Sequence, residues 1–310
     1  MLRRQMIATT LCMLTATAML APGCLPSETT IRVMTFNIWA DGKAGKQPLS
    51  QTAAVIKAAR ADIVGLQESH KNAKAIADLL GWNHVQQKPS VAVLSRFEIV
   101  ETTAQKNGVK IRVEPGQELL VFNVHFRPSP YQPYQLMNIP YGKGVFIKTE
   151  AQAIAQAGKA RGDQAAAMLE EVRLLVDKDT AVFVTGDFNE PSHLDWTPAA
   201  AKDGRHPIAV AYPASSAMAK AGFVDAYRKV HPDEMKRPGY TWTPRTKPDD
   251  PKDHHDRIDF VYFRGRGVGV RSAKIIGENK NNADITVTPY PSDHRAVVAE
   301  ITIPKPVGER

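Results

Sequence analysis

Cysteine is scarce in this chain, which contains only Cys12 and Cys24 among its 310 residues. Cys12 lies in an N-terminal segment that we expect to be removed, so Cys24 is left without a partner for an intramolecular disulfide. A small fold held together by disulfides is therefore excluded. The lack of cysteine also disfavours a structural zinc site built from thiolates.

Long runs of one charge are lacking as well. No block of five like charges occurs, and the net charge of +8 is spread along the chain. A spread positive charge gives only weak support for an anionic partner such as a nucleic acid or a phosphorylated metabolite. Hydrophobic residues make up 43% of the chain, which suits a large core and excludes a disordered or fibrous protein.

Residues 1–24 resemble an export signal. Two arginines precede an apolar stretch at residues 6–20, which is too short and too rich in threonine and alanine for a transmembrane helix. A lone cysteine after such a stretch resembles a bacterial lipoprotein site, where Cys24 would be lipidated and tether the protein to a membrane. Simple cleavage near Ala21 is the alternative, because the residues before Cys24 depart from the usual lipoprotein pattern. We expect an exported protein that is periplasmic, membrane-anchored or secreted.

A short linker is expected at residues 25–30, followed by a single domain at residues 31–304. The expected strands lie at residues 31–36, 62–66, 91–95, 98–103, 109–113, 118–126, 182–189, 257–263, 268–276 and 294–303. The expected helices lie at residues 51–60, 72–80, 149–175 and 215–221. Because helices separate some strands and hairpins separate others, the pattern predicts an α/β (α+β) fold with mixed sheets rather than a strict βαβ repeat.

Two segments of this pattern are unusual. Residues 127–148 are dense in proline, tyrosine and glycine, which predicts a long irregular segment, either a lid or an Ω-like loop. The long helix contains Gly158 and Gly162, where we expect breaks.

The segment 182–189, Val-Phe-Val-Thr-Gly-Asp-Phe-Asn, reads as a buried strand that ends in polar groups. In layered α/β folds, chemistry takes place at such strand ends. Asp187 and Asn189 are two positions apart, so their side chains point the same way in extended geometry. A turn is the alternative interpretation, because Gly-Asp-Phe-Asn is also turn-like.

Other expected strands also contain polar side chains or end in them. These residues are Asn37, Glu68, Asn123, His125, Asp259, Asp293 and His294. Each alone is compatible with a solvated strand end, a cap or a turn. Asp259 is harder to explain in this way, because a carboxylate between Ile258 and Phe260 is costly unless it is paired, and His294 is a candidate partner.

These residue types indicate a chemistry. Carboxylates and amides without cysteine make an oxygen-rich site, which favours a hard cation such as Mg²⁺, Mn²⁺ or Ca²⁺. Histidines beside carboxylates suit general acid and base roles. A hard cation beside a histidine–aspartate pair fits the hydrolysis of a phosphate ester.

Taken together, the motifs resemble the endonuclease/exonuclease/phosphatase superfamily, which includes deoxyribonuclease I, bacterial neutral sphingomyelinases and inositol-polyphosphate 5-phosphatases. The matching pieces occur in family order at residues 35–39, 62–68, 91–96, 123–125, 186–189, 257–261 and 292–294. The resemblance implies a four-layered α/β sandwich, with the site at the top of two packed mixed β-sheets flanked by helices. It also implies that Glu68 holds the metal, helped by Asn37 and Asp293.

Further roles are implied by the same resemblance. Asp187 and Asn189 would contact the scissile phosphate and the attacking water. His294, oriented by Asp259, would be the general base or a stabiliser of the transition state. His125 would be the general acid or a phosphate ligand.

The Asn-x-His form at residues 123–125 bears on the substrate. Abasic-site endonucleases of the family typically carry a tyrosine-containing pattern there, whereas this form looks like the deoxyribonuclease I, sphingomyelinase and phosphatase branches. Asn123 is accordingly expected to contact the substrate.

We expect a metal-dependent phosphoesterase, with a phosphodiesterase slightly favoured over a monoesterase. The substrate would be a phospholipid headgroup, a nucleic acid or an inositol phosphate. Four aromatic residues of the irregular segment suit insertion at a bilayer interface, although a plain surface loop is the alternative. They are Tyr131, Tyr134, Tyr141 and Phe146.

Other interpretations remain open at this point. An extracellular nuclease would fit the positive charge. Residues 253–257, Asp-His-His-Asp-Arg, fit either a second metal site or a polar loop near the active site. A catalytically silent, surface-binding lipoprotein is disfavoured because all the expected catalytic residues are present, and no obligate protein partner is indicated.

Overall fold

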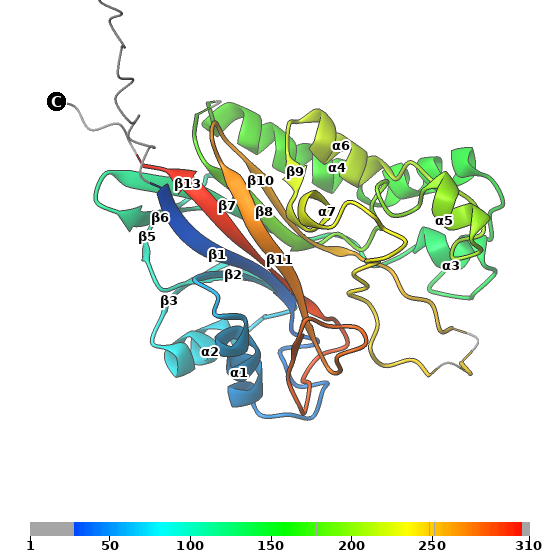
Figure 1. Ribbon diagram of the computed structural model, residues 1–310, viewed down its shortest axis with the longest axis horizontal. Helices are drawn as coiled ribbons and strands as arrows, with labels where there is room; N and C mark the ends of the chain where they lie inside the picture. The colour runs from blue at the N-terminus through cyan, green and yellow to red at the C-terminus, as the bar shows by residue number, and fades with distance from the viewer. Residues whose placement is uncertain (1–27, 178, 248, 251, 306–310) are drawn as a thin grey trace, which may run out of the picture.

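Two β-sheets form the centre of the molecule in the computed structural model (Figure 1). It describes residues 28–177, 179–247, 249–250 and 252–305. The expected export signal and Cys24 lie outside these residues. None of the helices within them is both long and apolar enough to span a bilayer.

The first sheet has seven strands in the order β12-β11-β13-β1-β2-β4-β3. Its strands are β1 (Glu28–Asn37), β2 (Ile63–Gln67), β3 (Asn83–Lys88), β4 (Val91–Ser95), β11 (Gly269–Gly277), β12 (Ile285–Thr286) and β13 (Ala296–Pro304). The second sheet has six strands in the order β5-β6-β7-β8-β10-β9. Its strands are β5 (Glu98–Thr102), β6 (Gly108–Glu114), β7 (Gln117–His125), β8 (Val182–Asp187), β9 (Val224–Asp225) and β10 (Asp259–Arg264).

Both sheets are mixed, as predicted. Strands β1 and β2 are parallel, as are β7 and β8, whereas β13 runs antiparallel to β1 and β10 antiparallel to β8. Parallel neighbours bring their carboxyl ends to the same edge, and an antiparallel neighbour brings its amino end there. One edge of each sheet therefore collects polar residues from several strands.

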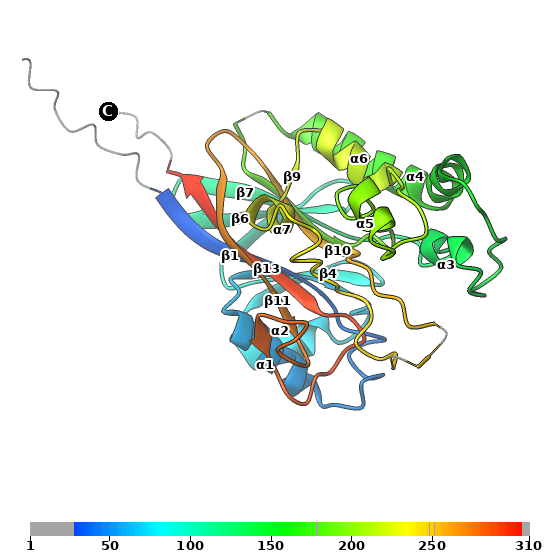
Figure 2. The ribbon, with the colours of Figure 1, turned by 45° about the vertical axis from the view of Figure 1, so that its right-hand side comes forward.

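Helices cover the outer faces of both sheets, which gives four layers (Figure 2). The helices are α1 (Leu49–Ala59), α2 (Ala73–Leu80), α3 (Gln132–Leu136), α4 (Glu150–Leu175), α5 (Pro198–Lys202), α6 (Pro213–Lys220) and α7 (Ala226–Val230). Helices α1 and α2 pack on the first sheet, and α4 and α6 pack on the second. A third apolar layer, which includes Val33 and Phe183, lies between the sheets. This is the predicted four-layered sandwich.

Some element boundaries differ from the prediction. Residues 28–30, expected in the linker, belong to β1 because they pair with residues 302–304 of β13. Helix α4 runs through Gly158 and Gly162 without a break, since it buries a face rich in alanine and begins at a capping box formed by Thr149 and Gln152. The irregular segment contains the short helix α3, and β3, β9, α5 and α7 were not predicted.

A layer of polar side chains bridges the two sheets just below the edge where the strands end. Asn123 of β7 donates its amide hydrogens to the carbonyl oxygens of Leu66 and Ala92 in the first sheet. Its Oδ1 accepts from Gln67 Nε2 at 2.7 Å and from Thr185 Oγ1 at 3.1 Å. Since all four hydrogen-bonding positions of this amide are filled, the bridge fixes the spacing of the sheets.

Gly65 permits this close approach. A Cβ atom at residue 65 would lie 2.1 Å from Thr185 Oγ1 and 2.5 Å from Asn123 Oδ1. Both atoms are held by hydrogen bonds and cannot move aside freely. We expect Gly65→Ala to lower the free energy of unfolding by about 1–3 kcal/mol through overpacking, as measured by chemical denaturation.

Gly158→Ala is the matched control, because nothing lies within 4 Å of a Cβ atom at that helical position. It should raise the free energy of unfolding by about 0.5–1 kcal/mol, the usual gain for alanine over glycine in a helix. Equal stability of Gly65→Ala and the unchanged protein would contradict the tight spacing of the sheets.

Candidate active site

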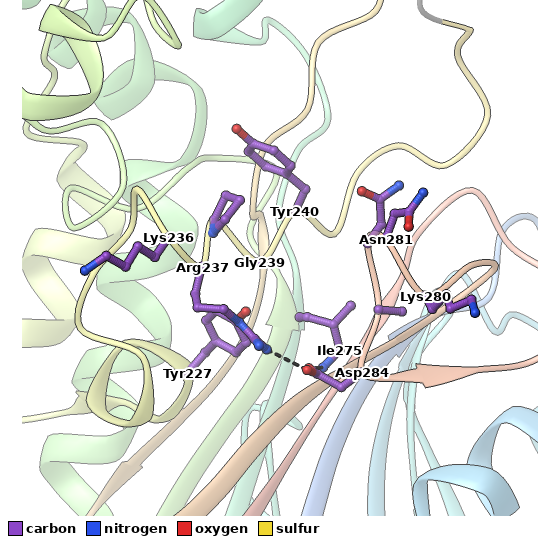
Figure 3. A pocket seen from close by; sticks show the side chains of 12 residues that line it. Tyr227, Lys236, Arg237, Gly239, Tyr240, Ile275, Lys280, Asn281 and Asp284 are labelled. Atoms are coloured by element: carbon purple, nitrogen blue, oxygen red, sulfur yellow. Dashed lines mark hydrogen bonds and ion pairs between the residues drawn. The ribbon is translucent and has the colours of Figure 1, made fainter.

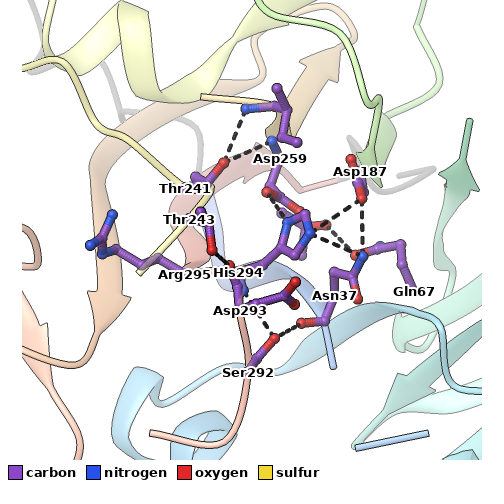
Figure 4. Close-up of polar contacts among 12 residues, drawn as sticks. Asn37, Gln67, Asp187, Thr241, Thr243, Asp259, Ser292, Asp293, His294 and Arg295 are labelled. Atoms are coloured by element: carbon purple, nitrogen blue, oxygen red, sulfur yellow. Dashed lines mark hydrogen bonds and ion pairs between the residues drawn. The ribbon is translucent and has the colours of Figure 1, made fainter. Parts of the chain in front are cut away.

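The polar strand ends of both sheets gather at one cleft and directly behind it. Figure 4 shows the contacts among Asn37, Asp187, Asp259 and His294. The first sheet contributes Asn37 at the end of β1, Glu68 after β2, and Asp293 and His294 before β13. The second sheet contributes His125 at the end of β7, Asp187 at the end of β8 and Asp259 at the start of β10. In the second sheet these three residues are direct neighbours, since Asp187 pairs with both His125 and Asp259.

His294 and Asp259 form a buried pair across the two sheets. Nδ1 of His294 lies 2.9 Å from Oδ2 of Asp259. The side chains are 5% and 0% exposed, so the contact is shielded from water. Thr241 Oγ1 accepts hydrogen bonds from the backbone N–H groups of Ile258 and Asp259, which holds the start of β10 in place. The predicted orientation of His294 by Asp259 agrees with this geometry.

Asp187 is the centre of the site. Its Oδ2 accepts from Asn37 Nδ2 at 3.0 Å, and its Oδ1 accepts from the backbone N–H of Asn189 at 2.8 Å. Nε2 of His125 and Nε2 of His294 approach Oδ2 to 3.6 Å and 3.8 Å. The predicted partners from four separate segments are thus brought together around one carboxylate.

Asn189 lies in the left-handed region with φ +49, which turns its side chain back toward Asp187. Its Nδ2 donates to Asp187 Oδ2 at 3.2 Å and to the carbonyl oxygen of Phe126 at 3.0 Å. Only its Oδ1 remains for a ligand. Asn189 therefore orients Asp187 and also borders the cleft.

The fit of a hard cation can be judged from Glu68 and Asp293, which border the same cleft. Glu68 is held by the N–H of Ala40 and by Asn37 Nδ2, at 2.6 Å and 3.3 Å. Oδ1 of Asp293 is buried and has no hydrogen-bond partner. An unpartnered carboxylate oxygen opposite a second carboxylate fits the oxygen donors that Mg²⁺, Mn²⁺ and Ca²⁺ prefer.

The predicted metal role of Asn37 is less well supported. Its Oδ1 accepts from the backbone N–H of Trp39 at 3.0 Å, and its amide nitrogen faces Glu68 and Asp187. An amide ligates a cation through its oxygen, which here points the other way. Asn37 is better described as a positioning residue that bridges the two carboxylates.

Burial and neighbouring charges shift several pKa values at the site. Burial alone would lower the pKa of His294, but the carboxylates of Asp259 and Asp187 raise it to about 10. Burial, reinforced by Asp259, raises the pKa of Asp187. Burial also raises the pKa of Asp293. For Glu68 burial acts in the same direction, but the hydrogen bonds from Ala40 and Asn37 outweigh it and lower the pKa.

Asn123 does not face the cleft as expected. It is 2% exposed, and the inter-sheet bridge occupies its whole amide. It shares a strand face with His125, but it lies deeper between the sheets. Its amide therefore has a structural role, and Asn123 borders only the neighbouring cleft beside His125.

The cleft has an aromatic wall that the motif analysis did not identify as part of the site. Its volume is about 280 Å³, and its aromatic lining residues are Trp39, Tyr131, Tyr141 and Trp242. The backbone of Trp242 forms isolated β-bridges with Asp256 and with His294. The position of Trp39 two residues after Asn37 was the one signal in the sequence that placed an aromatic ring near the site.

Two other features lie outside this cleft. A pocket of about 160 Å³ lies between Tyr227, Tyr240 and the loop that carries Asp284 (Figure 3). It contains none of the predicted site residues, and Arg237 is paired with Asp284 at 2.5 Å across it. His254 and Asp256 of the 253–257 stretch are buried behind the aromatic wall and do not line the cleft.

Comparison with known proteins places the chain. The endonuclease/exonuclease/phosphatase family matches residues 34–294. The chain belongs to this family. An uncharacterized protein of Caenorhabditis elegans is 29% identical over 293 residues, which cover 88% of this chain and 91% of that protein.

Solved structures confirm the fold. The 3′ phosphatase NExo from Neisseria, bound to a product DNA hairpin, has a TM-score of 0.57 at 20% identity. The match covers 87% of this chain and 98% of that one. An AP endonuclease from Archaeoglobus fulgidus has a TM-score of 0.53 at 18% identity, over 87% of this chain and 98% of that chain. Membership of the family makes this protein a metal-dependent hydrolase of phosphoric ester bonds.

The raised pKa of His294 predicts a dependence of stability on pH. A group whose pKa is raised from 6.5 to about 10 on folding binds its proton more tightly in the folded protein. Its stabilisation is complete below pH 6.5 and is lost as the pH rises through about 10. With a chelator present, the free energy of unfolding should fall across this window by at most about 1.4 kcal/mol for each pH unit.

His294→Gln should lack this fall, so its stability should approach that of the unchanged protein as the pH rises. His231→Gln is the control, because the His231 imidazole contacts the carbonyl oxygen of Ala273, away from the site. The free energy of unfolding of this control variant should fall with pH as steeply as that of the unchanged protein. A difference between the His294 variant and the unchanged protein that does not vary with pH would contradict the buried ion pair.

Proposed function

We propose that this protein is an exported, divalent-metal-dependent phosphodiesterase. The observation that carries the proposal is that His125 borders two clefts of similar size, of about 280 Å³ and about 270 Å³. A phosphodiester carries a substituent on each of two ester oxygens, whereas a monoester carries one. Two clefts that meet at one imidazole match a diester.

The two clefts differ in chemistry. One has the aromatic wall described above. The other has a polar lining that includes Lys88, Gln105, Asn107 and Gln164. The aromatic cleft suits a base or an apolar group, and the second cleft, which Val91, Val124 and Phe126 also line, suits a group with both polar and apolar parts.

The chemistry at phosphorus is assigned to residues from both sheets. Of the two roles considered, we assign transition-state stabilisation to His294, because its Nδ1 pairs with Asp259 at 2.9 Å and its Nε2 lies 3.8 Å from Asp187. These two carboxylates favour the charged imidazolium and raise its pKa. Asp187 then takes the role of base and accepts the proton of the attacking water, helped by Asn189. His125 is only partly buried, and its Nε2 faces Asp187, so it can donate a proton to the leaving oxygen.

A divalent cation completes the site. Glu68 and Asp293 are the residues that would hold it, and Mg²⁺ is proposed, with Mn²⁺ or Ca²⁺ as alternatives. When bound, it would offset negative charge on the phosphate oxygens.

A membrane-associated substrate is supported by two features. Residues 1–24 read as an export signal, and Cys24 provides a candidate lipid anchor. Beside the cleft, Tyr141, Val145 and Phe146 are 38%, 62% and 52% exposed. Tyr131 and Tyr134, predicted to join such a surface, are buried instead. A phospholipid headgroup is therefore the substrate class that we favour.

A nuclease is the second candidate. The similar NExo structure contains a product DNA hairpin, and the net charge of +8 attracts a polyanion. A catalytically silent binding protein is not favoured, because His125, Asp187, Asn189 and His294 line the cleft and Asp259 is paired with His294 behind it.

Metal removal tests the reaction class. The purified protein should hydrolyse bis-p-nitrophenyl phosphate with Mg²⁺ or Mn²⁺ and lose turnover with a chelator. Glu68→Gln should raise the Mg²⁺ concentration for half-maximal rate by about tenfold or more, since it removes a charged ligand. Glu300→Gln is the control, because Glu300 pairs with Arg32 on β1 outside the cleft. Turnover that is insensitive to the chelator would refute the metal mechanism.

A substrate panel tests the diester and membrane assignments. Turnover of bis-p-nitrophenyl phosphate should exceed that of p-nitrophenyl phosphate by about tenfold or more. Phospholipid vesicles, sphingomyelin, DNA, RNA and inositol phosphates are then compared under the same conditions. Phe146→Ser should lower the rate on vesicles and leave the rate on the soluble diester unchanged. Faster cleavage of DNA or RNA than of lipids would establish the nuclease alternative.

A further inference from the structure

Three polar side chains that the active site does not use meet behind the aromatic wall of the cleft. They are His206, His254 and Asp256, which are 5%, 8% and 2% exposed. One nitrogen of each imidazole and one oxygen of the carboxylate lie within 4.8 Å of one another. Polar groups buried this deeply are expected to have partners.

Two nitrogens of this cluster lack such partners. Nδ1 of His206 and Nε2 of His254 are buried and accept or donate no hydrogen bond among the described residues. Nε2 of His254 lies 2.8 Å from Oδ2 of Asp256, which is an ion-pair contact with angles outside hydrogen-bond geometry. Nδ1 of His206 has no partner of either kind among the described residues.

The surroundings orient the cluster as they would orient metal ligands. Trp196 Nε1 donates to Asp256 Oδ1 at 2.8 Å, and the hydroxyl of Tyr131 donates to Oδ2 at 2.5 Å. Each carboxylate oxygen has two lone pairs, so each can accept a hydrogen bond and still ligate a metal. The Trp196 ring stacks on His206 with ring centroids 4.1 Å apart. Outer hydrogen bonds and packing of this kind are typical of metal sites.

There is also room for a small occupant. A cavity of about 10 Å³, about the space of one water molecule, is bordered by His206 and Asp256, while His254 approaches Asp256 from outside it. Two buried arginines, Arg228 and Arg257, border it as well. Both are paired with Asp195, at 2.6 Å and 2.8 Å, so they do not neutralise Asp256.

We propose that His206, His254 and Asp256 bind a transition-metal ion of the Zn²⁺ class, at a second site separate from the carboxylate site of the cleft. Two imidazoles and one carboxylate form a Zn²⁺ donor set that leaves one position for water. Mg²⁺ and Ca²⁺ prefer oxygen ligands alone, so the two sites select different cations.

The metal would stabilise the wall of the aromatic cleft. The side chain of Asp256 accepts a hydrogen bond from the hydroxyl of Tyr131, and its backbone pairs with that of Trp242. Tyr131 and Trp242 both line the cleft. His206 comes from the loop after α5, whereas Asp256 precedes β10. Binding would therefore join two long loops and fix two aromatic side chains at the substrate site.

Metal content tests the proposal. The full-length protein is stripped with a chelator, equilibrated with Zn²⁺, desalted and measured by mass spectrometry for zinc. The unchanged protein should retain about one zinc ion per chain. His206→Gln and Asp256→Asn should weaken zinc binding by about tenfold or more, and a Co²⁺ absorption spectrum should change in the same variants. Zinc should also raise the Tm of the unchanged protein and not that of His206→Gln.

Two controls separate this site from other effects. Glu68→Gln should retain zinc, since that residue belongs to the cleft. His193→Gln should retain it too, because the His193 imidazole bonds to Ser215 outside the cluster. Absence of retained zinc from the unchanged protein, or equal retention by a folded His206→Gln variant, would mean that His254 and Asp256 form an ordinary buried ion pair. The content of the unchanged protein decides this result even if a variant fails to fold.

Discussion

The spacing of the two sheets is fixed by the polar bridge of Gln67, Asn123 and Thr185, and the active site depends on that spacing. Glu68 and His294 belong to the first sheet, whereas Asp187 and Asp259 belong to the second. The contacts between His294 and Asp259 and between Asn37 and Asp187 therefore exist only while the sheets keep their separation. A fully hydrogen-bonded network directly below the site holds this separation more strictly than apolar packing, which tolerates repacking.

The same site concentrates charge that destabilises the fold. Asp187 and Asp259 are both almost completely buried, and one oxygen of Asp259 has no hydrogen-bond partner. A buried carboxylate is unfavourable unless a positive group compensates it, and His294 compensates both. Asp293 and Glu68 have no cationic side chain of the described residues in direct contact, so the positive charge would have to come from the cation proposed to bind there. Local rules of stability are broken here because catalysis requires the charges.

Much of the fold and site followed from the sequence because the signals were local. Alternating apolar residues predicted most strands, and polar residues at strand ends predicted Asp187, Asp259 and His294. The failures have physical reasons. The alternation of side chains along a strand predicts the face on which Asn123 lies, but not its depth between the sheets. Strand β3 has a largely polar sequence in which only Gln87 is buried, so no apolar alternation indicated it.

The loops around the cleft escaped prediction because their order comes from contacts distant in sequence. Arg161 of α4 is completely buried and donates to the carbonyl oxygens of Arg127 and Pro130 and to Gln132. Tyr131, in the same loop, is held by Asp256. Residues 131–136 of the segment expected as a lid are therefore a fixed, buried wall, whereas its later part, with Val145 and Phe146, is exposed. A wall held in this way presents a preorganised aromatic surface to the substrate, so that binding need not supply the free energy of ordering it.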